Sequence, residues 1–329
     1  MINLLDLEPK KISKDLKGKY ILMYGAAKVG KTTFASMIPK ALIFSFEPGV
    51  NALNNVYSIT ITSWREMKQY VKQLESEGVK AKYDFCVIDT VDIAYDLAEQ
   101  YICAQNGVNA IGDLPYGKGY DLLKKEFASV FRKIAQLGYG LFFISHSQEK
   151  VIKNPDKTES IIIQPACPTR AKDIVNKLVD FIVYASPEWN QETNSMDRYL
   201  YLRGNEVITA GSRFKYMPDK IPFNYKIFID CLYEAIDRQI EEDGAQNYEE
   251  KENFYLSTTT IPFDTLMEKA KDIWTKITEK DGSDKTYAQL AEIIQKNFGS
   301  VVQLSTVNES QKDMLILTVE DLEEMYRNM

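Results

Sequence analysis

The sequence predicts an α/β fold in which a mostly parallel central sheet is flanked by helices. Three observations in the first half of the 329-residue chain favour it: short, almost wholly apolar segments recur, amphipathic helical patterns separate them, and a glycine-containing loop joins the first apolar segment to a helix. Strands that are apolar on both faces are typical of parallel sheets covered by helices on both sides. A small helical module is expected near the C-terminus.

Predicted strands and helices alternate along the first 150 residues. The apolar segments expected to form buried strands are 20–24, 41–46, 83–89 and 141–145. Helices are expected from the loop after the first strand to about Pro39, from Ser63 to Gly78, and over 91–104 and about 118–137. The Ser63 helix begins with a capping box, because Glu66 follows three residues later, and a glycine is typical of a helix end.

The pattern changes after residue 148. A β-hairpin is expected over 149–164, further strands over 180–185, 198–204 and 206–210, and a helix capped by Asn224 from 225 to about 240. We therefore expect an α/β core over 1–240 with a basic N-terminal arm, an acidic linker over 241–260 and a small helical C-terminal module over 261–329. A flexible, solvated arm is the default interpretation of its lysines. These are Lys10, Lys11, Lys14, Lys17 and Lys19.

Composition and charge argue against several classes of protein. Four cysteines without CxxC spacing and a single histidine make a zinc site or a disulfide scaffold improbable. The chain has no apolar run that could span a bilayer and no signal-peptide pattern, so we expect a cytoplasmic protein without a membrane partner. The net charge of -7 is uneven, since 241–329 hold 9 Lys/Arg against 19 Asp/Glu and 1–240 hold 31 against 28. A locally basic groove is therefore compatible with the acidic average.

The segment GAAKVGKT, residues 25–32, matches the phosphate-binding pattern G-x-x-x-x-G-K-[ST]. An apolar strand precedes it and a helix follows, so backbone N–H groups and the positive helix end can hold the phosphates of ATP. Lys31 is expected to contact the β- and γ-phosphates, and Thr32 to supply a hydroxyl ligand for Mg²⁺. The predicted nucleotide-binding residues are Gly25, Ala26, Ala27, Lys28, Val29, Gly30, Lys31, Thr32 and Thr33. The alternative is a glycine turn with an incidental surface lysine.

Polar residues directly end or follow three of the predicted strands. Asp89 ends FCVID, so we expect its carboxylate at the carboxyl edge of the sheet as the second Mg²⁺ anchor. Glu47 follows ALIFSF and is the candidate to orient or deprotonate the attacking water, or else it only begins the turn Glu47-Pro48-Gly49. His146, the only histidine, follows LFFIS and either senses the γ-phosphate by a hydrogen bond or is a satisfied histidine at a strand end.

The order of these motifs resembles the RecA-like recombinase core. The phosphate loop, Glu47 after the second strand, Asp89 in VIDT and a polar residue after FFIS follow one another, and the likeness covers roughly residues 15–240. Within that group the chain is similar to the phage-encoded RecA-type ATPases associated with single-strand annealing, in the AAA-labelled phage nucleotide-binding family. PYGKGYDLLKKEF (115–127) and the run from FFISHS add to the likeness. The resemblance implies a RecA-like P-loop NTPase core and, for a phage protein, the host cytoplasm.

The resemblance also assigns roles to individual residues. It makes Glu47 the water-activating carboxylate and His146 the γ-phosphate sensor, where many recombinases have glutamine. Arg213 in GSRFKYMP resembles an element with which RecA-like subunits reach a neighbour's nucleotide, although Gly211 replaces its first lysine. Such an arginine would stabilise developing phosphoryl charge in trans. The alternatives are an ordinary surface role for Arg213 and a finger role for Lys215.

Single-stranded DNA is the partner that the resemblance implies. The stretch after the sensor, residues 147–170, would help to hold it, or is only a solvated sheet edge, because its basic excess is small. The segment 104–125 combines tyrosines, lysines and glycines, and its rings could stack bases or pack on the sheet. Such a protein would act as a homo-oligomer, in a ring or filament.

Three functions remain open at this point. The leading hypothesis is a Mg²⁺-dependent ATPase that binds single-stranded DNA and promotes annealing or recombination. The second is a nucleotide-gated loader or interaction protein of the replication machinery without its own DNA grip. The third is a small-molecule kinase, which ranks last because no arginine-rich lid segment is evident. In the acidic C-terminal module we expect a docking site for a replication or single-strand-binding protein, or a self-regulating element.

Overall fold

The computed structural model describes residues 12–153, 158–243, 262–300 and 303–329. The chain divides into two compact units, residues 1–257 and 258–329, and each is considered by itself. The predicted linker falls largely on 244–261, which lies outside the described residues, as do Lys10 and Lys11 of the predicted arm.

A ten-stranded sheet forms the centre of the first unit within the described residues. Its strands are β1 (Tyr20–Gly25), β2 (Ala41–Ser45), β3 (Tyr57–Thr60), β4 (Phe85–Asp89), β5 (Gly140–Lys153), β6 (Glu159–Pro165), β7 (Phe181–Asn190), β8 (Ser195–Tyr201), β9 (Gly211–Ser212) and β10 (Lys220–Pro222). The order across the sheet is β10-β8-β7-β1-β5-β4-β2-β3, with β6 paired to β5 and β9 to β7. Strands β1 to β5 and β7 pair in parallel, which confirms the predicted α/β fold with a mostly parallel sheet.

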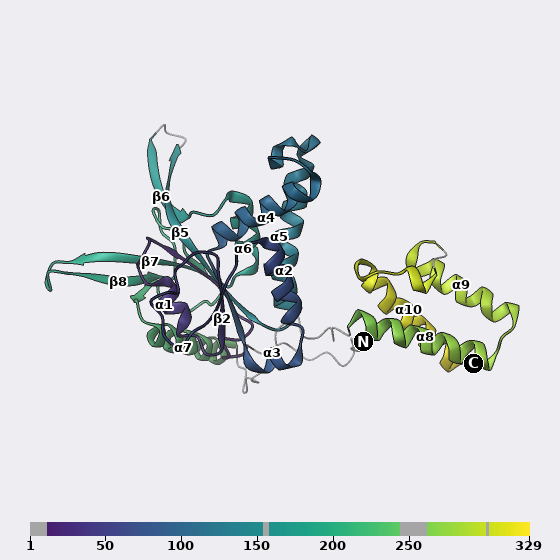
Figure 1. Cartoon of the computed structure of the whole chain (residues 1–329). Coiled ribbons are helices and arrows are strands. Elements are labelled where there is room, and N and C mark those ends of the chain that lie inside the picture. Colours follow the sequence, from purple (N-terminus) through teal and green to yellow (C-terminus); the bar gives the residue numbers. More distant parts are fainter. Residues whose placement is uncertain (1–11, 154–157, 244–261, 301–302) are drawn as a thin grey trace. The chain divides into compact units, whose positions relative to one another are not determined.

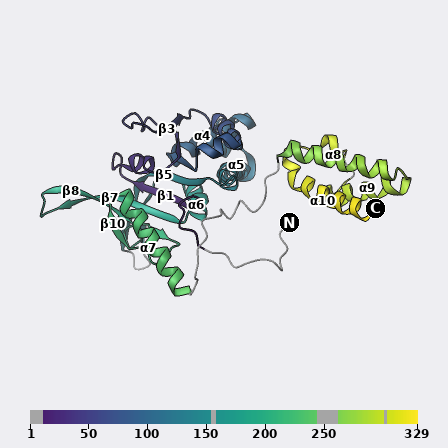
Figure 2. The same cartoon turned by 90° about the horizontal axis from the view of Figure 1, so that it is seen from below.

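Helices cover both faces of the sheet (Figure 2). They are α1 (Lys31–Ser36), α2 (Trp64–Gln73), α3 (Glu77–Lys82), α4 (Val91–Asn106), α5 (Lys118–Gln136), α6 (Thr169–Leu178) and α7 (Tyr225–Asp243). Helices α2, α4, α5 and α6 pack on one face, and α1 and α7 on the other. Along β1, Tyr20 and Leu22 face the first layer and Ile21 and Met23 the second. Because each fully buried apolar side chain contributes about 1.5–3 kcal/mol, this two-sided burial explains why β1 is apolar without alternation.

Two local predictions were wrong. The helix that begins after Ser63 ends at Gln73 rather than Gly78, because the N–H groups of Glu75 and Ser76 donate to carbonyl oxygens three residues back rather than four. Gly78 lies inside the separate helix α3. The predicted strand 206–210 is only an isolated bridge between Ile208 and Ile163.

The failed strand has a local cause. The Asn205 side chain accepts the backbone N–H groups of Val207 and Ile208 at 2.9 and 2.8 Å. Such side-chain turns compete with the hydrogen bonds of a sheet. The N-terminal lysines that the structure describes also differ from a free arm, since Lys17 pairs with Asp84 at 2.6 Å and Lys14 with Asp237 at 2.5 Å.

Two projections rise from the same edge of the sheet (Figure 1). One is the hairpin of β5 and β6, which the sequence predicts over 149–164, although in the structure the predicted strand 141–145 runs on into it as a single strand, β5. The other is the connection between α4 and α5, which contains the short helical turns Ile111–Asp113 and Pro115–Gly117. Because β1, β4 and β5 are parallel, this is also the edge at which the phosphate loop begins.

The second unit is a three-helix module. It contains α8 (Phe263–Lys280), α9 (Asp284–Phe298) and α10 (Lys312–Asn328), close to the predicted helices. Its own core is built from Leu266, Ala270, Ile273, Ile277, Leu290, Val307, Leu315, Val319 and Leu322. No helix in the described part of the chain is long and apolar enough to cross a membrane.

Candidate functional site

The segment Gly25–Gly30 joins β1 to α1 and has a backbone that only certain residues accept. At Gly25, a Cβ atom would lie 2.4 Å from the Ala185 carbonyl oxygen, because β7 approaches closely. Gly30 has a φ of 109°, in the left-handed region, and Lys28 has a φ of 63°. The two glycines of the motif are therefore required by close approach and by conformation. The predicted nucleotide-binding residues form this loop and the start of α1.

Lys31 is buried beneath the loop. Only 6% of it is exposed, and its Nζ donates to the carbonyl oxygens of Gly25 and Ala26 at 3.0 and 2.9 Å. Burial lowers the pKa of Lys31, and the neighbouring carboxylates of Asp89 and Glu47 oppose that effect. A phosphate group would compensate this buried ammonium better than neutral carbonyl groups do.

Thr32 and Asp89 meet at the head of α1 and the end of β4. The Thr32 hydroxyl donates to Asp89 Oδ2 at 2.7 Å, and Asp89 is 1% exposed. Burial raises the pKa of Asp89 and nearby Glu47 adds to the rise, while the hydrogen bond from Thr32 and the charges of Lys31 and His146 oppose it. Two oxygen ligands this close fit a shared Mg²⁺. No group of three or more His, Cys, Asp or Glu that could hold a metal occurs among the described residues, so phosphate and water oxygens would complete the coordination.

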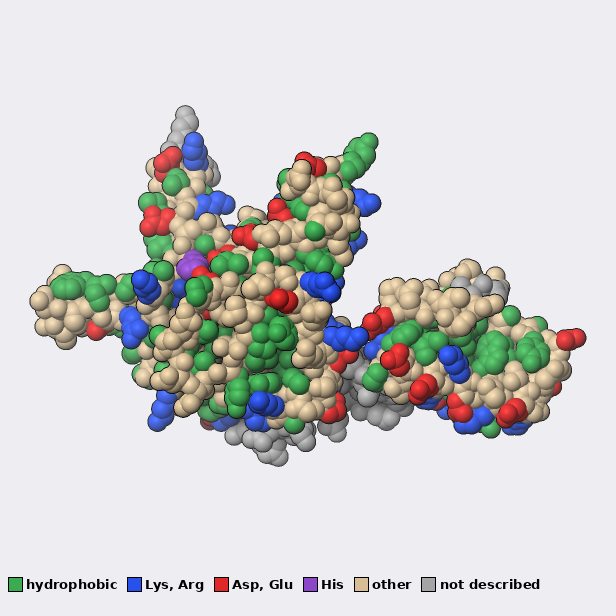
Figure 3. Space-filling view, in the orientation of Figure 1, with side chains coloured by type: hydrophobic (Ala, Val, Ile, Leu, Met, Phe, Trp, Pro, Cys, Tyr) green, Lys and Arg blue, Asp and Glu red, His purple; other side chains and the backbone are tan. Residues whose placement is uncertain are grey.

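His146 lies between two carboxylates. It directly follows the buried part of β5, and its Nε2 is 3.8 Å from Glu47 Oε1 while its Nδ1 is 3.1 Å from Asp92 Oδ2. In the space-filling view the histidine, in purple, lies at the foot of the β5–β6 hairpin, facing the hollow between the two projections (Figure 3). The structure thus brings Lys31, Glu47 and His146 to the same edge of the sheet as Asp89.

Asp92 is a site residue that the sequence analysis missed. It lies in the first turn of α4, three residues after Asp89, and this spacing is the only signal in the sequence that points to it. Its Oδ1 and the Thr90 hydroxyl are buried and have no hydrogen-bond partner among the described residues. Buried polar groups are nearly always satisfied, so the Asp92 oxygen fits a site that takes up water, and the Thr90 hydroxyl fits one that takes up water or a phosphate oxygen.

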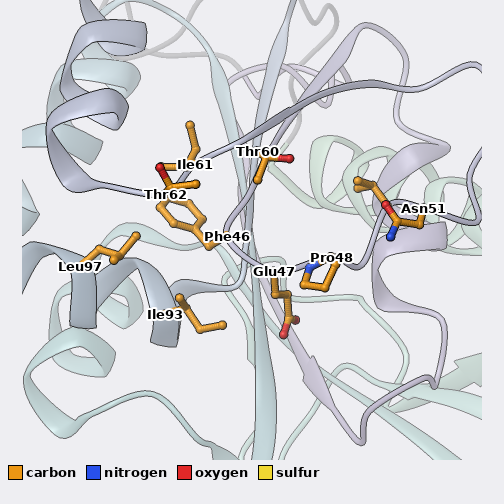
Figure 4. A pocket seen from close by; sticks show the side chains of 10 residues that line it. Phe46, Glu47, Pro48, Asn51, Thr60, Ile61, Thr62, Ile93 and Leu97 are labelled. Carbon is orange, nitrogen blue, oxygen red and sulfur yellow. The ribbon is translucent and has the colours of Figure 1, made fainter.

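Glu47 begins a turn and also borders a pocket. Its carbonyl accepts the Ser45 hydroxyl at 2.5 Å and the Gly49 N–H at 2.7 Å, which is the predicted turn, and its carboxylate stays a candidate to orient water. The pocket, of about 270 Å³, is lined by Phe46, Glu47, Pro48, Val50, Asn51, Thr60, Ile61, Thr62, Ile93 and Leu97 (Figure 4). Its wall is mainly apolar, and the Glu47 side chain is 30% exposed.

Arg213 lies away from these residues in its own chain. It follows β9, which pairs with the first residues of β7, at the amino edge of the sheet. Its guanidinium donates to Asp180 Oδ1 at 3.0 Å and to the Lys177 carbonyl at 3.1 Å. Lys215 pairs with Glu242 at 2.7 Å. A role of either residue at a nucleotide therefore requires a second subunit.

Arg198 is a second residue that the sequence analysis missed. It lies on β8, and its Nη1 donates to the Val29 carbonyl of the phosphate loop at 3.1 Å. The guanidinium carbon is 5.2 Å from the centre of the Phe223 ring. No local pattern marks Arg198, because its place depends on the pairing of Arg198 with Pro187 of β7.

The chain is similar to a known protein family, to a prophage-derived protein and to a solved structure. A family model described as an AAA domain matches residues 17–214, which include the phosphate loop, Asp89 and His146. The SPbeta prophage-derived uncharacterized protein YorG of Bacillus subtilis (strain 168) is 28% identical over 334 residues, covering 98% of each chain. Among solved structures, the KaiC-like protein PH0186 from Pyrococcus horikoshii OT3 matches 63% of this chain and 86% of its own, with 12% identity and a TM-score of 0.36.

Proposed function

Because the chain belongs to the AAA domain family, we propose that it is a Mg²⁺-dependent ATPase that binds single-stranded DNA and promotes annealing or recombination in phage DNA metabolism. The observation that carries the ATPase part is the 2.7 Å contact between Thr32 and Asp89 beside the buried Lys31. The prophage origin of a 28% identical relative supports the phage setting, and the host cytoplasm as the place of action.

Each residue of the site has a task in hydrolysis. Lys31 and the loop N–H groups hold the phosphates, and Thr32 and Asp89 hold the Mg²⁺, which neutralises phosphate charge when it is bound. Glu47 orients the attacking water and accepts its proton. His146 contacts the terminal phosphate, and Asp92 fixes the orientation of the imidazole through Nδ1.

The two projections supply the proposed DNA grip. On the hairpin, Lys150 is opposite Ile162 and Lys153 is opposite Glu159. Of these two lysines, Lys153 faces a carboxylate on the neighbouring strand and Lys150 does not. On the other projection, Tyr116 has a relative exposure of 105% and a left-handed φ of 57°, which presents its ring fully to solvent. An exposed lysine on one projection and an exposed ring on the other suit a single strand, whose phosphates need neutralising and whose bases stack.

Oligomerisation is the second element of the proposal. Arg213 lies at the amino edge of the sheet, opposite the phosphate loop, so it does not act in its own chain. In a homo-oligomeric ring or filament it would release Asp180 and approach a neighbour's γ-phosphate. Mixing Lys31→Ala and Arg213→Ala subunits tests this idea. Each variant alone should be inactive, and the mixture should regain part of the hydrolysis. Co-assembled mixtures that stay inactive contradict a site in trans.

The decisive experiment measures ATP hydrolysis with and without a single-stranded oligonucleotide, at two stated salt concentrations. We expect stimulation by DNA, loss of hydrolysis in Lys31→Ala, and DNA affinity that falls as salt rises. Lys150→Ala should lower the slope of log affinity against log salt by about one. Lys153→Ala on the same hairpin is the matched control and should change the slope less, because Glu159 already offsets its charge.

A loader or interaction protein without a DNA grip is the second candidate. The observation that favours it is the C-terminal unit, which has its own core and an acidic surface that would repel DNA. We propose that this unit docks a replication or single-strand-binding protein. ATP binding without DNA stimulation or salt-sensitive DNA binding would favour the loader. If deletion of 245–329 left every partner interaction and the DNA affinity unchanged, the docking role would be wrong.

A further inference from the structure

The candidate site fixes which way a bound triphosphate runs, because its residues are unevenly placed on the two sides of β1. Asp89, Glu47 and His146 come from β4, β2 and β5, which all lie on one side of β1 in the sheet. These residues define where the metal and the terminal phosphate belong. A triphosphate seated in the loop with that end toward β5 must direct its nucleoside toward the other side of β1, where β7 and β8 lie.

Arg198 is the residue on that other side whose side chain contacts the phosphate loop. Its backbone is held by pairing with Pro187 of β7 and by the Phe223 N–H, which donates to the Arg198 carbonyl at 2.8 Å. Its guanidinium uses one N–H on the Val29 carbonyl and lies near the Phe223 ring. Phe223 in turn packs edge-on against Phe34 of α1, with ring centres 5.5 Å apart. The arginine is therefore anchored to the helix that follows the phosphate loop.

The rest of the guanidinium is available to a ligand. The structure records no ion pair for Arg198 among the described residues, although the side chain carries five N–H donors. It is an exposed residue, and its Nη1 would lie 3.0 Å from a Cβ at Gly30. A planar cation fixed over the loop can stack on a base and donate to ribose oxygens.

We propose that Arg198, supported by Phe223, binds the nucleoside half of a nucleoside triphosphate. This inference rests on the proposed nucleotide site and adds the residue that distinguishes a nucleotide from a bare polyphosphate. The terminal phosphates are held by Lys31 and the loop, so Arg198 contributes to affinity for ATP and little to affinity for inorganic triphosphate.

The test compares two ligands on the full-length protein by calorimetry with Mg²⁺: the non-hydrolysable β,γ-imido analogue of ATP, and inorganic triphosphate. Arg198→Met keeps an apolar stem against Phe223 and removes the donors. We expect it to bind the ATP analogue about tenfold more weakly, as for the loss of a charged hydrogen bond, and inorganic triphosphate within about twofold of the wild type. Arg203→Met is the control, since its guanidinium holds the Met217 carbonyl at 3.1 Å.

The outcomes separate this inference from the proposed function. Equal weakening of both ligands would mean that Arg198 only shapes the loop through Val29, and unchanged affinity for the ATP analogue would mean that it has no role; either result overturns the inference. Wild-type protein that binds neither ligand would overturn the nucleotide site itself. Arg198→Lys should restore less than half of the binding free energy for the ATP analogue that Arg198→Met loses, because lysine lacks the planar fork of the guanidinium.

Discussion

Aspartates at the two edges of the sheet have opposite environments. At the amino edge, Asp84 pairs with Lys17 at 2.6 Å and Lys40 at 3.3 Å, and Asp180 accepts from Arg213 and from the Tyr20 N–H. At the carboxyl edge, Asp89 is buried against a hydroxyl, and Asp92 keeps a buried oxygen without a partner among the described residues. The carboxylates at the amino edge have charged partners within the chain, whereas those at the carboxyl edge remain available to a ligand.

The pKa directions express this difference. Burial raises the pKa of Asp89, and its partners do not overcome that effect. For Asp84 burial acts in the same sense, but the ion pairs with Lys17 and Lys40 outweigh it and lower the pKa. Ionised Asp84 therefore stabilises the folded chain, whereas ionised Asp89 destabilises it, a cost that a bound cation would offset. Perturbed carboxylates of the second kind are typical of functional sites.

Replacing the aspartate at each edge in turn should separate function from stability. The replacement of Asp89 should have the largest effect of all, on ATP hydrolysis. Asp89→Asn is expected to reduce Mg²⁺-dependent ATP hydrolysis more than about 100-fold, because the metal loses its anionic ligand. Without nucleotide, its free energy of unfolding in urea should equal or exceed that of the wild type. Asp84→Asn is the matched control and should keep hydrolysis within about twofold. Asp89→Asn protein that hydrolyses normally would remove Asp89 from the site.

A smaller effect is expected at Asp92, which touches His146 rather than the nucleotide. Asp92→Asn should lower kcat about tenfold and leave KM nearly unchanged, as for loss of a group that orients another. The double variant with His146→Gln should be no worse than His146→Gln alone, because the two residues act together. Additive losses in kinetic assays of the four proteins would show that Asp92 acts independently of the imidazole.

At the amino edge, the effect should appear in stability and depend on pH. Because the folded-state pKa of Asp84 is lowered, its stabilisation is present above the unfolded value of about 3.9 and is lost as the pH falls through the folded value. Asp84→Asn should therefore lower the free energy of unfolding by about 1 kcal/mol at pH 7. The difference from the wild type should vanish in strong acid. Urea titrations at pH 7 and pH 3 check this, and an equal loss at both would mean that the ion pairs do not matter.

Sequence alone predicts the phosphate loop and the strand ends beside it, but not the contacts of Arg198 and Arg213. The phosphate loop is a contiguous motif, and Glu47, Asp89 and His146 come together because parallel strands end at one edge. The contacts of Arg198 cannot be predicted in this way, because they depend on how the β7–β8 hairpin is registered against a loop 169 residues away. For the same reason the position of Arg213 opposite Asp180 follows only from the pairing of β9 with β7.

Local competition explains the remaining differences between sequence and structure. The hydrophobic pattern of 206–210 is that of a strand, yet a single asparagine side chain captures the N–H groups that a ladder would use. Gly78 is of the residue type that often ends helices, yet the N–H groups of Glu75 and Ser76 donate to carbonyl oxygens three residues back, and α2 ends at Gln73. Neither hydrogen-bond pattern can be predicted from hydrophobic periodicity.

The smallest expected effect distinguishes the two lysines that share Asp84. Lys17 lies 2.6 Å from the carboxylate with 38% of its side chain exposed, whereas Lys40 lies at 3.3 Å with 55% exposed. Exposed pairs contribute about 0–1 kcal/mol, so Lys17→Met should cost more than Lys40→Met, and the latter less than about 0.5 kcal/mol. Residue 40 has a left-handed φ of 54°, which disfavours lysine and methionine alike. Backbone strain is therefore the same in the wild type and in Lys40→Met, and it does not contribute to the measured difference. Adding 1 M NaCl should reduce both losses by screening, and a Lys40→Met loss that exceeds the Lys17→Met loss would contradict the geometric ranking.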